Sequence, residues 1–184
     1  MRLLVTGTSG GIGGAVKEAA LARGHEVVEL NRADWCGDAP LSGAFDAVVF
    51  ATGTCPVKPL AALSDGEFAE TVAVNCGYFV RLMRRLVSER LYAPAGMKVV
   101  AVSSVSATEG WAGGVAYCAS KGALSAACRA LDAELKPRGI SVRALEPRYV
   151  KTRMFDACAG RMGVDAKLAQ APKAFAEEIL ELVR

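Results

Sequence analysis

The first 30 residues of the chain alternate in the order strand, glycine-rich turn, helix, strand. The apolar run 3–5 leads into Gly7–Gly14, which holds five glycines, and a helical pattern then continues to about Arg23, where Gly24 ends it. A second strand is expected at 26–30. The helix is expected to turn inward Ile12, Val16, Ala19, Ala20 and Leu21. Glycines let the backbone approach a pyrophosphate, and a helix N-terminus offers free N–H groups, so this unit predicts a dinucleotide site.

The residues just after the second strand are expected to read the ribose of that dinucleotide. An acidic side chain at this point selects NAD, and a basic one accommodates the 2′-phosphate of NADP. Glu29 falls inside the strand, two residues too early, whereas Asn31 and Arg32 lie at its end. We therefore expect NADP, with NAD less favoured; the alternative is that Arg32 is a solvated surface residue.

The remaining chain continues the alternation of strands and helices. Strands are expected at 45–51, 97–103 and 140–145, and helices at 64–75, 78–91, 115–136 and 173–183. Ser64 and Glu67 predict a capping box, and Pro172 is expected at the first turn of the last helix. The pattern predicts an α/β fold with one domain over 1–184: a doubly wound parallel sheet of five strands, ordered second, first, third, fourth, fifth.

Composition excludes several other classes of protein. The net charge of +3 is spread along 184 residues, and no basic run is interleaved with aromatic residues, so nucleic acid is not expected as a partner. Six scattered cysteines without a Cys-x-x-Cys pair argue against a metal site and a disulfide framework. No apolar stretch reaches the roughly 18 residues that span a bilayer. We expect a cytoplasmic protein with no membrane partner.

Tyr117 and Lys121 stand four residues apart in the helix expected at 115–136. At this spacing both side chains leave the same face of the helix. A cation one turn away favours the phenolate, which lowers the pKa of a tyrosine and suits it for proton transfer. By itself the pair is also a common surface arrangement, so its meaning depends on the residues around it.

Several stretches together resemble the short-chain dehydrogenase/reductase family over about residues 2–153. In chain order they are Thr6-Gly7-x-x-x-Gly11-Ile12-Gly13, the strand end 46–53, Asn75, Ser104, Tyr117-x-x-x-Lys121 and the run from Pro147 to Thr152. Ser104 precedes Tyr117 by thirteen residues, as is usual in the family. The resemblance implies a Rossmann-like fold.

The resemblance also implies a role for each matching residue. Tyr117 would be the general acid/base, and Lys121 would lower its pKa and hydrogen-bond the nicotinamide ribose. Ser104 would polarise the substrate carbonyl, and Asn75 would hold a water of the proton relay. The cofactor would be bound by Gly7, Thr8, Ser9, Gly11, Ile12, Gly13, Asn31, Arg32, Asp34, Ala51, Thr52, Gly53, Tyr117, Lys121, Pro147 and Thr152.

The chain departs from the family pattern in four places. Segment 33–44 leaves no room for the usual extra helix and strand, and we assign Asp34 there to the adenine-contacting aspartate of the family, with Trp35 packing beside it. Residues 50–52, Phe-Ala-Thr, replace an Asn-Asn-Ala run. Arg148 replaces the glycine after the proline and is a candidate cation toward cofactor phosphate. The usual last strand is not expected, because the chain ends at a helix.

The function expected from these features is reduction of a carbonyl to a secondary alcohol, or the reverse, with NADPH. Two alternatives come from other classes: a catalytically silent NADP-binding regulatory protein on the same fold, and an adaptor without a nucleotide, which would leave the glycine turn unexplained. The segment 153–171, together with Trp111, predicts a partly apolar pocket for a small-molecule substrate. Small carbonyls, quinones and acyl thioesters all remain candidates. A homodimer through helices 78–91 and 115–136 is expected, because small residues line the second helix.

Overall fold

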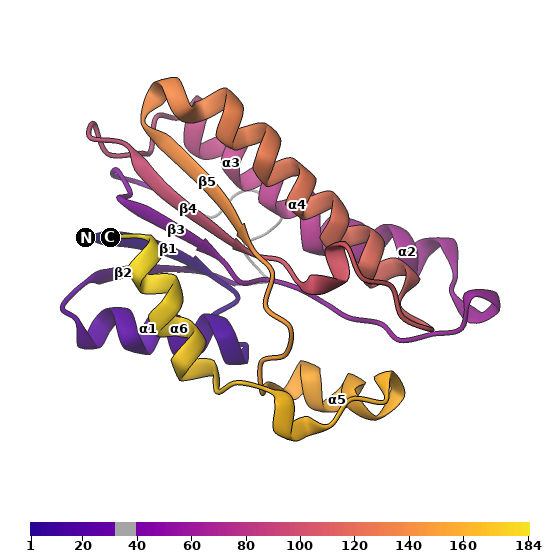
Figure 1. Ribbon diagram of the computed structural model, residues 1–184. Coiled ribbons are helices and arrows are strands. Elements are labelled where there is room, and N and C mark those ends of the chain that lie inside the picture. Colours follow the sequence, from indigo (N-terminus) through magenta and orange to yellow (C-terminus); the bar gives the residue numbers. More distant parts are fainter. Residues whose placement is uncertain (32–39) are drawn as a thin grey trace.

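The computed structural model of the protein describes residues 1–31 and 40–184, and within these ranges it contains a sheet of five parallel strands (Figure 1). The strands are β1 (Arg2–Thr6), β2 (Glu26–Leu30), β3 (Ala47–Phe50), β4 (Met97–Val102) and β5 (Ile140–Leu145). Their spatial order is β2-β1-β3-β4-β5, which confirms the predicted topology. The described residues between β2 and β3 form no strand.

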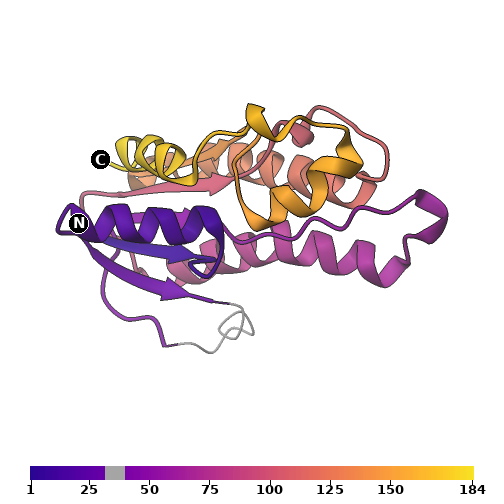
Figure 2. The same ribbon diagram turned by 90° about the horizontal axis from the view of Figure 1, so that it is seen from below.

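Helices cover both faces of this sheet (Figures 1 and 2). One face carries α1 (Gly11–Ala22) and α6 (Pro172–Leu182), and the other carries α3 (Tyr78–Ser88) and α4 (Val115–Leu135). Two further helices, α2 (Asp65–Val72) and α5 (Arg153–Met162), extend past the carboxyl ends of the strands. The chain therefore has the doubly wound α/β architecture that its alternating pattern predicts.

Alternate side chains of the central strands enter two separate cores, because successive side chains of a strand point to opposite faces. In β1, Leu4 packs on the α3–α4 side, whereas Leu3 and Val5 pack on the α1–α6 side. Phe50, at the end of β3, meets Phe79 of α3 with ring centroids 5.3 Å apart. These strands are buried on both faces, which explains why most of their residues are apolar.

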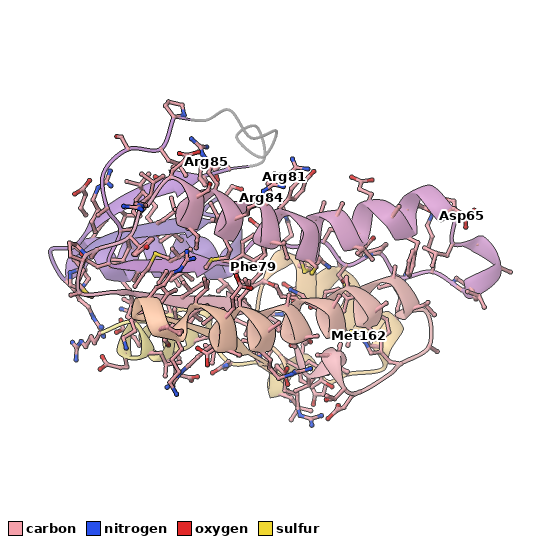
Figure 3. All side chains as sticks on the ribbon, turned by 90° about the horizontal axis from the view of Figure 1, so that it is seen from above. Asp65, Phe79, Arg81, Arg84, Arg85 and Met162 are labelled. Atoms are coloured by element: carbon pink, nitrogen blue, oxygen red, sulfur yellow. The ribbon has the colours of Figure 1, made fainter. Side chains whose placement is uncertain are left out.

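The helix of residues 65–88 is continuous, where the sequence led us to expect two helices. A π-helical turn, η3 (Ala73–Gly77), joins α2 to α3. A single widened turn of this kind is frequent at functional sites. The predicted capping box of Ser64 and Glu67 is confirmed at the start of α2. On α3, Phe79 points inward, whereas Arg81, Arg84 and Arg85 project from the side away from α4 (Figure 3).

The structure corrects two local expectations. Leu21 is 50% exposed on α1 and does not face inward, because Val16, Ala19 and Ala20 already fill the contact with the sheet and α6. In addition, segment 153–171 contains a helix that the sequence did not predict, α5, which occupies its first ten residues. Pro172 opens α6 as predicted.

Among the described residues, no helix is both long enough and apolar enough to cross a membrane.

Candidate active site

A cavity of about 930 Å³ lies at the carboxyl ends of the strands. Gly7, Asn31, Ala51 and Ser103 line it, and each directly follows the last residue of a strand. Ligand sites of open α/β sheets form at this edge, where the loops after neighbouring strands meet. The residues predicted from the sequence that line the cavity are Gly7, Ser9, Gly11, Ile12, Asn31, Ala51, Thr52, Gly53, Ser104, Tyr117, Lys121, Pro147 and Thr152.

The glycine-rich turn is built so that no side chain could occupy three of its positions. Gly7 has φ +69°, and a Cβ there would lie 2.8 Å from the carbonyl oxygen of Ala51. A Cβ on Gly13 would lie 2.3 Å from the carbonyl oxygen of Gly7, where α1 packs closely on the turn. A Cβ on Gly11 would meet Thr152 at 2.6 Å. Within residues 1–31 and 40–184, no side chain caps the first turn of α1. This cradle fits a pyrophosphate group.

Thr8 lies outside the lining of the cavity and contacts the end of β2 instead. Its hydroxyl donates to the carboxylate of Glu29 and lies 3.0 Å from Oδ1 of Asn31. Hydrogen bonds from Lys17 and Thr8 lower the pKa of Glu29. Thr8 therefore connects the glycine turn to the strand end at which a ribose would be read. Arg32 and Asp34, predicted as cofactor ligands at this end, lie outside the described residues.

Ser104, Tyr117 and Lys121 meet on one wall of the cavity. Ser104 follows β4, caps the short helix η4 (Val105–Ala107) by accepting from the Ser106 N–H, and forms a hydrogen bond with Tyr117. Lys121 donates from Nζ to the Val102 carbonyl oxygen at 2.8 Å, and Nζ lies 5.7 Å from the centroid of the Tyr117 ring. The helical spacing of Tyr117 and Lys121 thus brings both to the same cavity.

The pKa of Tyr117 shifts in the direction opposite to the one the sequence led us to expect. Burial raises the pKa of the phenol, and the hydrogen bond from Ser104 opposes this shift only in part. Burial also lowers the pKa of Lys121, to about 8. With a pKa of about 8, Lys121 is still mostly protonated at pH 7, and its Nζ donates to the Val102 carbonyl.

Asn75 is fully buried beneath the loop after β3 and does not line the cavity itself. Its Oδ1 accepts from the Thr54 N–H at 2.8 Å, and its Nδ2 donates to the Thr54 carbonyl at 2.9 Å. Nδ2 also donates to Oγ of Ser120, which stands beside Lys121 in α4. The π-helical turn thus places Asn75 between the loop after β3 and α4, the helix that carries Tyr117, and its side chain bonds to both.

Arg148 forms an ion pair with a carboxylate, whereas the sequence suggested a cation directed at the cofactor phosphate. Both guanidinium Nη atoms contact Glu109, the shorter distance being 2.8 Å. The charge of Glu109 raises the pKa of Arg148. Both side chains are exposed, and the pair connects the loops that follow β4 and β5.

Sequence reasoning missed several residues of the cavity wall. Examples are Thr54, Cys55, Ser106, Tyr149 and Cys158. The first two follow the predicted strand end directly, so the rule that sites form at carboxyl ends of strands was sufficient to find them. Cys158 comes from α5, which the sequence did not reveal. Trp111, Met154, Phe155 and Met162, named from the sequence as the substrate side, all line the cavity.

Comparison with known proteins agrees with this geometry. Residues 38–161 match the family model for short chain dehydrogenases. The chain therefore belongs to the short-chain dehydrogenase/reductase family, a family of oxidoreductases. It is 28% identical to the short-chain reductase protein NovJ of Streptomyces niveus, over 88% of this chain and 74% of that protein. It is 27% identical to 3-oxoacyl-(acyl-carrier-protein) reductase FabG of Salmonella typhimurium, over 98% of this chain and 86% of that protein. It is 30% identical to D-threitol dehydrogenase of Mycolicibacterium smegmatis, over 82% of this chain and 70% of that protein.

Solved structures share the fold over the whole chain. A mutant 4-hydroxyisoleucine dehydrogenase complexed with NADH and succinate superposes with a TM-score of 0.85 at 20% identity, over 100% of this chain and 91% of that one. A putative NAD(P)-dependent gluconate 5-dehydrogenase from Beutenbergia cavernae with bound NADP has a TM-score of 0.83 at 23% identity, over 98% and 88%. At these identities the likeness concerns the fold alone.

Proposed function

We propose that the protein is an NADP-dependent oxidoreductase that reduces a carbonyl to a secondary alcohol or catalyses the reverse reaction. The observation that carries this proposal is the convergence of Ser104, Tyr117 and Lys121 on a cavity that the glycine-rich turn also lines. Proton transfer and dinucleotide binding would then take place in one cavity. Two relatives are named as reductases and a third as a dehydrogenase, which supports the same class of reaction.

The residues present fit a nicotinamide dinucleotide. Gly7, Gly10 and Gly11 line the cavity without side chains, and Gly13 lets α1 pack closely on the turn, as a pyrophosphate site requires. Such a cofactor, when bound, supplies or accepts the hydride. The preference for NADP over NAD rests on Arg32 in the sequence. One solved relative of this fold holds NADP and another holds NADH, so the fold accommodates both.

In the proposed reduction, Tyr117 transfers its proton to the substrate oxygen. Its raised pKa keeps the phenol protonated at neutral pH, which suits a general acid. The Ser104 hydroxyl, already bonded to Tyr117, would hydrogen-bond the same oxygen and stabilise its developing charge. Lys121 lies close enough to Tyr117 to hold the cofactor ribose beside it. Asn75 would position the loop after β3 and the helix of the tyrosine.

The test is oxidation of NADPH, compared with NADH, in the presence of small carbonyls, quinones and acyl thioesters. The wild-type protein should consume NADPH with at least one of these classes. Tyr117→Phe should lower kcat by about 10²–10⁴-fold while NADPH still binds. Tyr92→Phe, a tyrosine outside the cavity, is the matched control and should retain turnover. A protein that binds NADPH but turns over no carbonyl, or a Tyr117→Phe variant with full activity, would contradict the proposal.

We also propose that the protein forms a homodimer through α3 and α4. Val80 on α3 and Val115 on α4 are 43% and 44% exposed, and Ala119, Ala126 and Ala130 lie on the exposed side of α4. Small side chains allow helices of two copies to approach closely. Light scattering at micromolar concentration should give the mass of two chains, and a monomer would contradict this assembly.

A further inference from the structure

Helix α5 closes one side of the cavity and contacts the loop after β3 at two points. The thiol of Cys158 donates to the carbonyl oxygen of Cys55, with a sulfur–oxygen distance of 3.6 Å. Nη1 of Arg161 donates to the carbonyl oxygen of Val57 at 2.8 Å. Cys158 and Arg161 are three residues apart and therefore share a face of α5. The two contacts hold this face in a defined register against the loop.

This register brings two thiols together. The Cys158 thiol reaches the backbone of Cys55, interaction with Cys158 contributes to the raised pKa of the Cys55 thiol, and both thiols are free. Both residues also line the cavity, so a small solute in the cavity can reach them. Burial raises the pKa of the Cys55 thiol, as it does that of Tyr117 nearby. Two small residues that merely fill space would not need to face a solvent-connected cavity as a pair.

We propose that Cys55 and Cys158 are a redox modification site, a dithiol that hydroperoxides convert into a disulfide between α5 and the loop after β3. The site does not depend on the reaction proposed above, because both thiols belong to the wall of the cavity and neither takes part in proton transfer. The disulfide would tether α5 across the cavity, next to Tyr117, and would join residues 103 positions apart.

The chemistry balances with one hydroperoxide. The Cys158 sulfur, as thiolate, attacks one oxygen of hydrogen peroxide; the O–O bond breaks, a sulfenic acid forms on Cys158, and the other oxygen leaves as hydroxide, which takes up the proton that Cys158 lost and becomes water (an organic hydroperoxide would release its alcohol instead). Cys55 then loses its proton, its sulfur attacks the Cys158 sulfur, and the S–O bond breaks to release a second water. Two thiols are oxidised by two electrons, and these reduce the peroxide. The raised pKa of the Cys55 thiol keeps it protonated at neutral pH, so the second step is slow there and becomes faster at alkaline pH.

The experiment treats the full-length protein with stoichiometric hydrogen peroxide, blocks the remaining thiols, and maps tryptic peptides by mass spectrometry without reduction. The α5 peptide, 154–161, contains Cys158 as its one cysteine, and the partner peptide, 33–81, contains Cys36, Cys55 and Cys76. The expected result is a cross-link between these peptides that dithiothreitol reverses. Cys55→Ser and Cys158→Ser should abolish it, whereas Cys36→Ser, Cys76→Ser and Cys118→Ser should retain it.

Two further measurements distinguish a disulfide between Cys55 and Cys158 from oxidation without a disulfide and from a disulfide through another cysteine. In Cys55→Ser, dimedone should trap the sulfenic acid on Cys158, because the resolving thiol is missing. The unfolding midpoint of the oxidised wild type should rise by several degrees, because the cross-link closes a long loop of the unfolded chain, and that of Cys158→Ser should not. The free energies of unfolding of Cys55→Ala and Cys55→Ser, measured in the reduced state, show whether both variants still fold. A folded variant without the cross-link shows that the Cys55 thiol itself is required. A dimedone adduct without cross-link in the wild type, a cross-link through Cys36 or Cys118, or an unmodified α5 peptide would overturn the proposal.

Discussion

The side chain of Asn75 and the backbone of Thr54 exchange two hydrogen bonds, of 2.8 Å and 2.9 Å. The amide of Asn75 thus satisfies both polar groups of Thr54, much as a neighbouring strand would. Its Nδ2 makes a third bond, to Ser120. One side chain in the π-helical turn therefore holds the loop after β3 against the helix that carries Tyr117 and Lys121.

Asn75→Ala should destabilise the protein by about 2–4 kcal/mol, because it removes the Asn75 partners of the Thr54 N–H and carbonyl and one of the two hydrogen bonds of the Ser120 hydroxyl. Ser120→Ala is the control: it removes one of the three bonds of Asn75 and the bond to the Tyr117 carbonyl, and should cost about 1–2 kcal/mol. Urea denaturation measures both free energies of unfolding. Equal effects of the two substitutions would show that the bonds to Thr54 contribute nothing.

Gly13→Ala should weaken dinucleotide binding and destabilise the fold by about 2–4 kcal/mol. The added Cβ would lie 2.3 Å from the Gly7 carbonyl oxygen, which has no room to withdraw because it belongs to the turn itself. Gly66→Ala is the control, since a Cβ there meets nothing within 4 Å. Because Gly66 lies in α2, alanine should raise the free energy of unfolding by roughly 0.5–1 kcal/mol. Calorimetric titration with NADPH and urea denaturation check both substitutions, and undiminished NADPH binding by Gly13→Ala would contradict the cradle.

Lys121→Met should abolish activity yet stabilise the protein at pH 7. Burial lowers the pKa of Lys121 to about 8 in the folded state, against roughly 10.4 for an unperturbed lysine, so the charged form is penalised by folding. In the wild type, this pKa shift lowers the free energy of unfolding at pH 7 by about 3 kcal/mol at most. The variant is freed of this penalty, but part of the gain is lost because the Val102 carbonyl no longer has its hydrogen-bond donor.

The pH dependence of this effect has a definite sign. Between pH 8 and about 10.4 the unfolded chain holds a proton on Lys121 that the folded chain has lost, so the stability of the wild type rises with pH across this window. The advantage of Lys121→Met should therefore shrink from pH 7 to pH 10 in urea denaturation. A difference that widens with pH would mean that Lys121 is more stably protonated in the folded protein than in the unfolded chain.

Arg148 lines the cavity, but Arg148→Ala should leave the Kd for NADPH unchanged, because its guanidinium is engaged with Glu109. Arg32→Ala should weaken NADPH binding by about 10-fold, the effect of one charge-assisted hydrogen bond to a 2′-phosphate, and should leave NADH binding intact. Fluorescence titration with each cofactor measures both. A large effect of Arg148→Ala would show that the pair with Glu109 opens when the cofactor binds.

The sequence alone was sufficient to predict the order of the five strands, the glycine cradle and the shared face of Tyr117 and Lys121. Each of these depends on local regularities: apolar runs that mark buried strands, glycines between a strand and a helix, and side chains one helical turn apart. The parallel connections then leave few possible strand orders. The family resemblance added Ser104 and Asn75, which a periodic pattern does not distinguish from ordinary polar residues.

Only the tertiary structure decided how these parts act on one another. The direction of the Tyr117 pKa shift depends on burial by segments far away in the chain, and so does the low pKa of Lys121. The partner of Arg148, the π-helical turn at Asn75 and the meeting of Cys55 with Cys158 are set by packing between loops and helices. Sequence spacing carries no information about such contacts, because residues a hundred positions apart become neighbours only when the chain is folded.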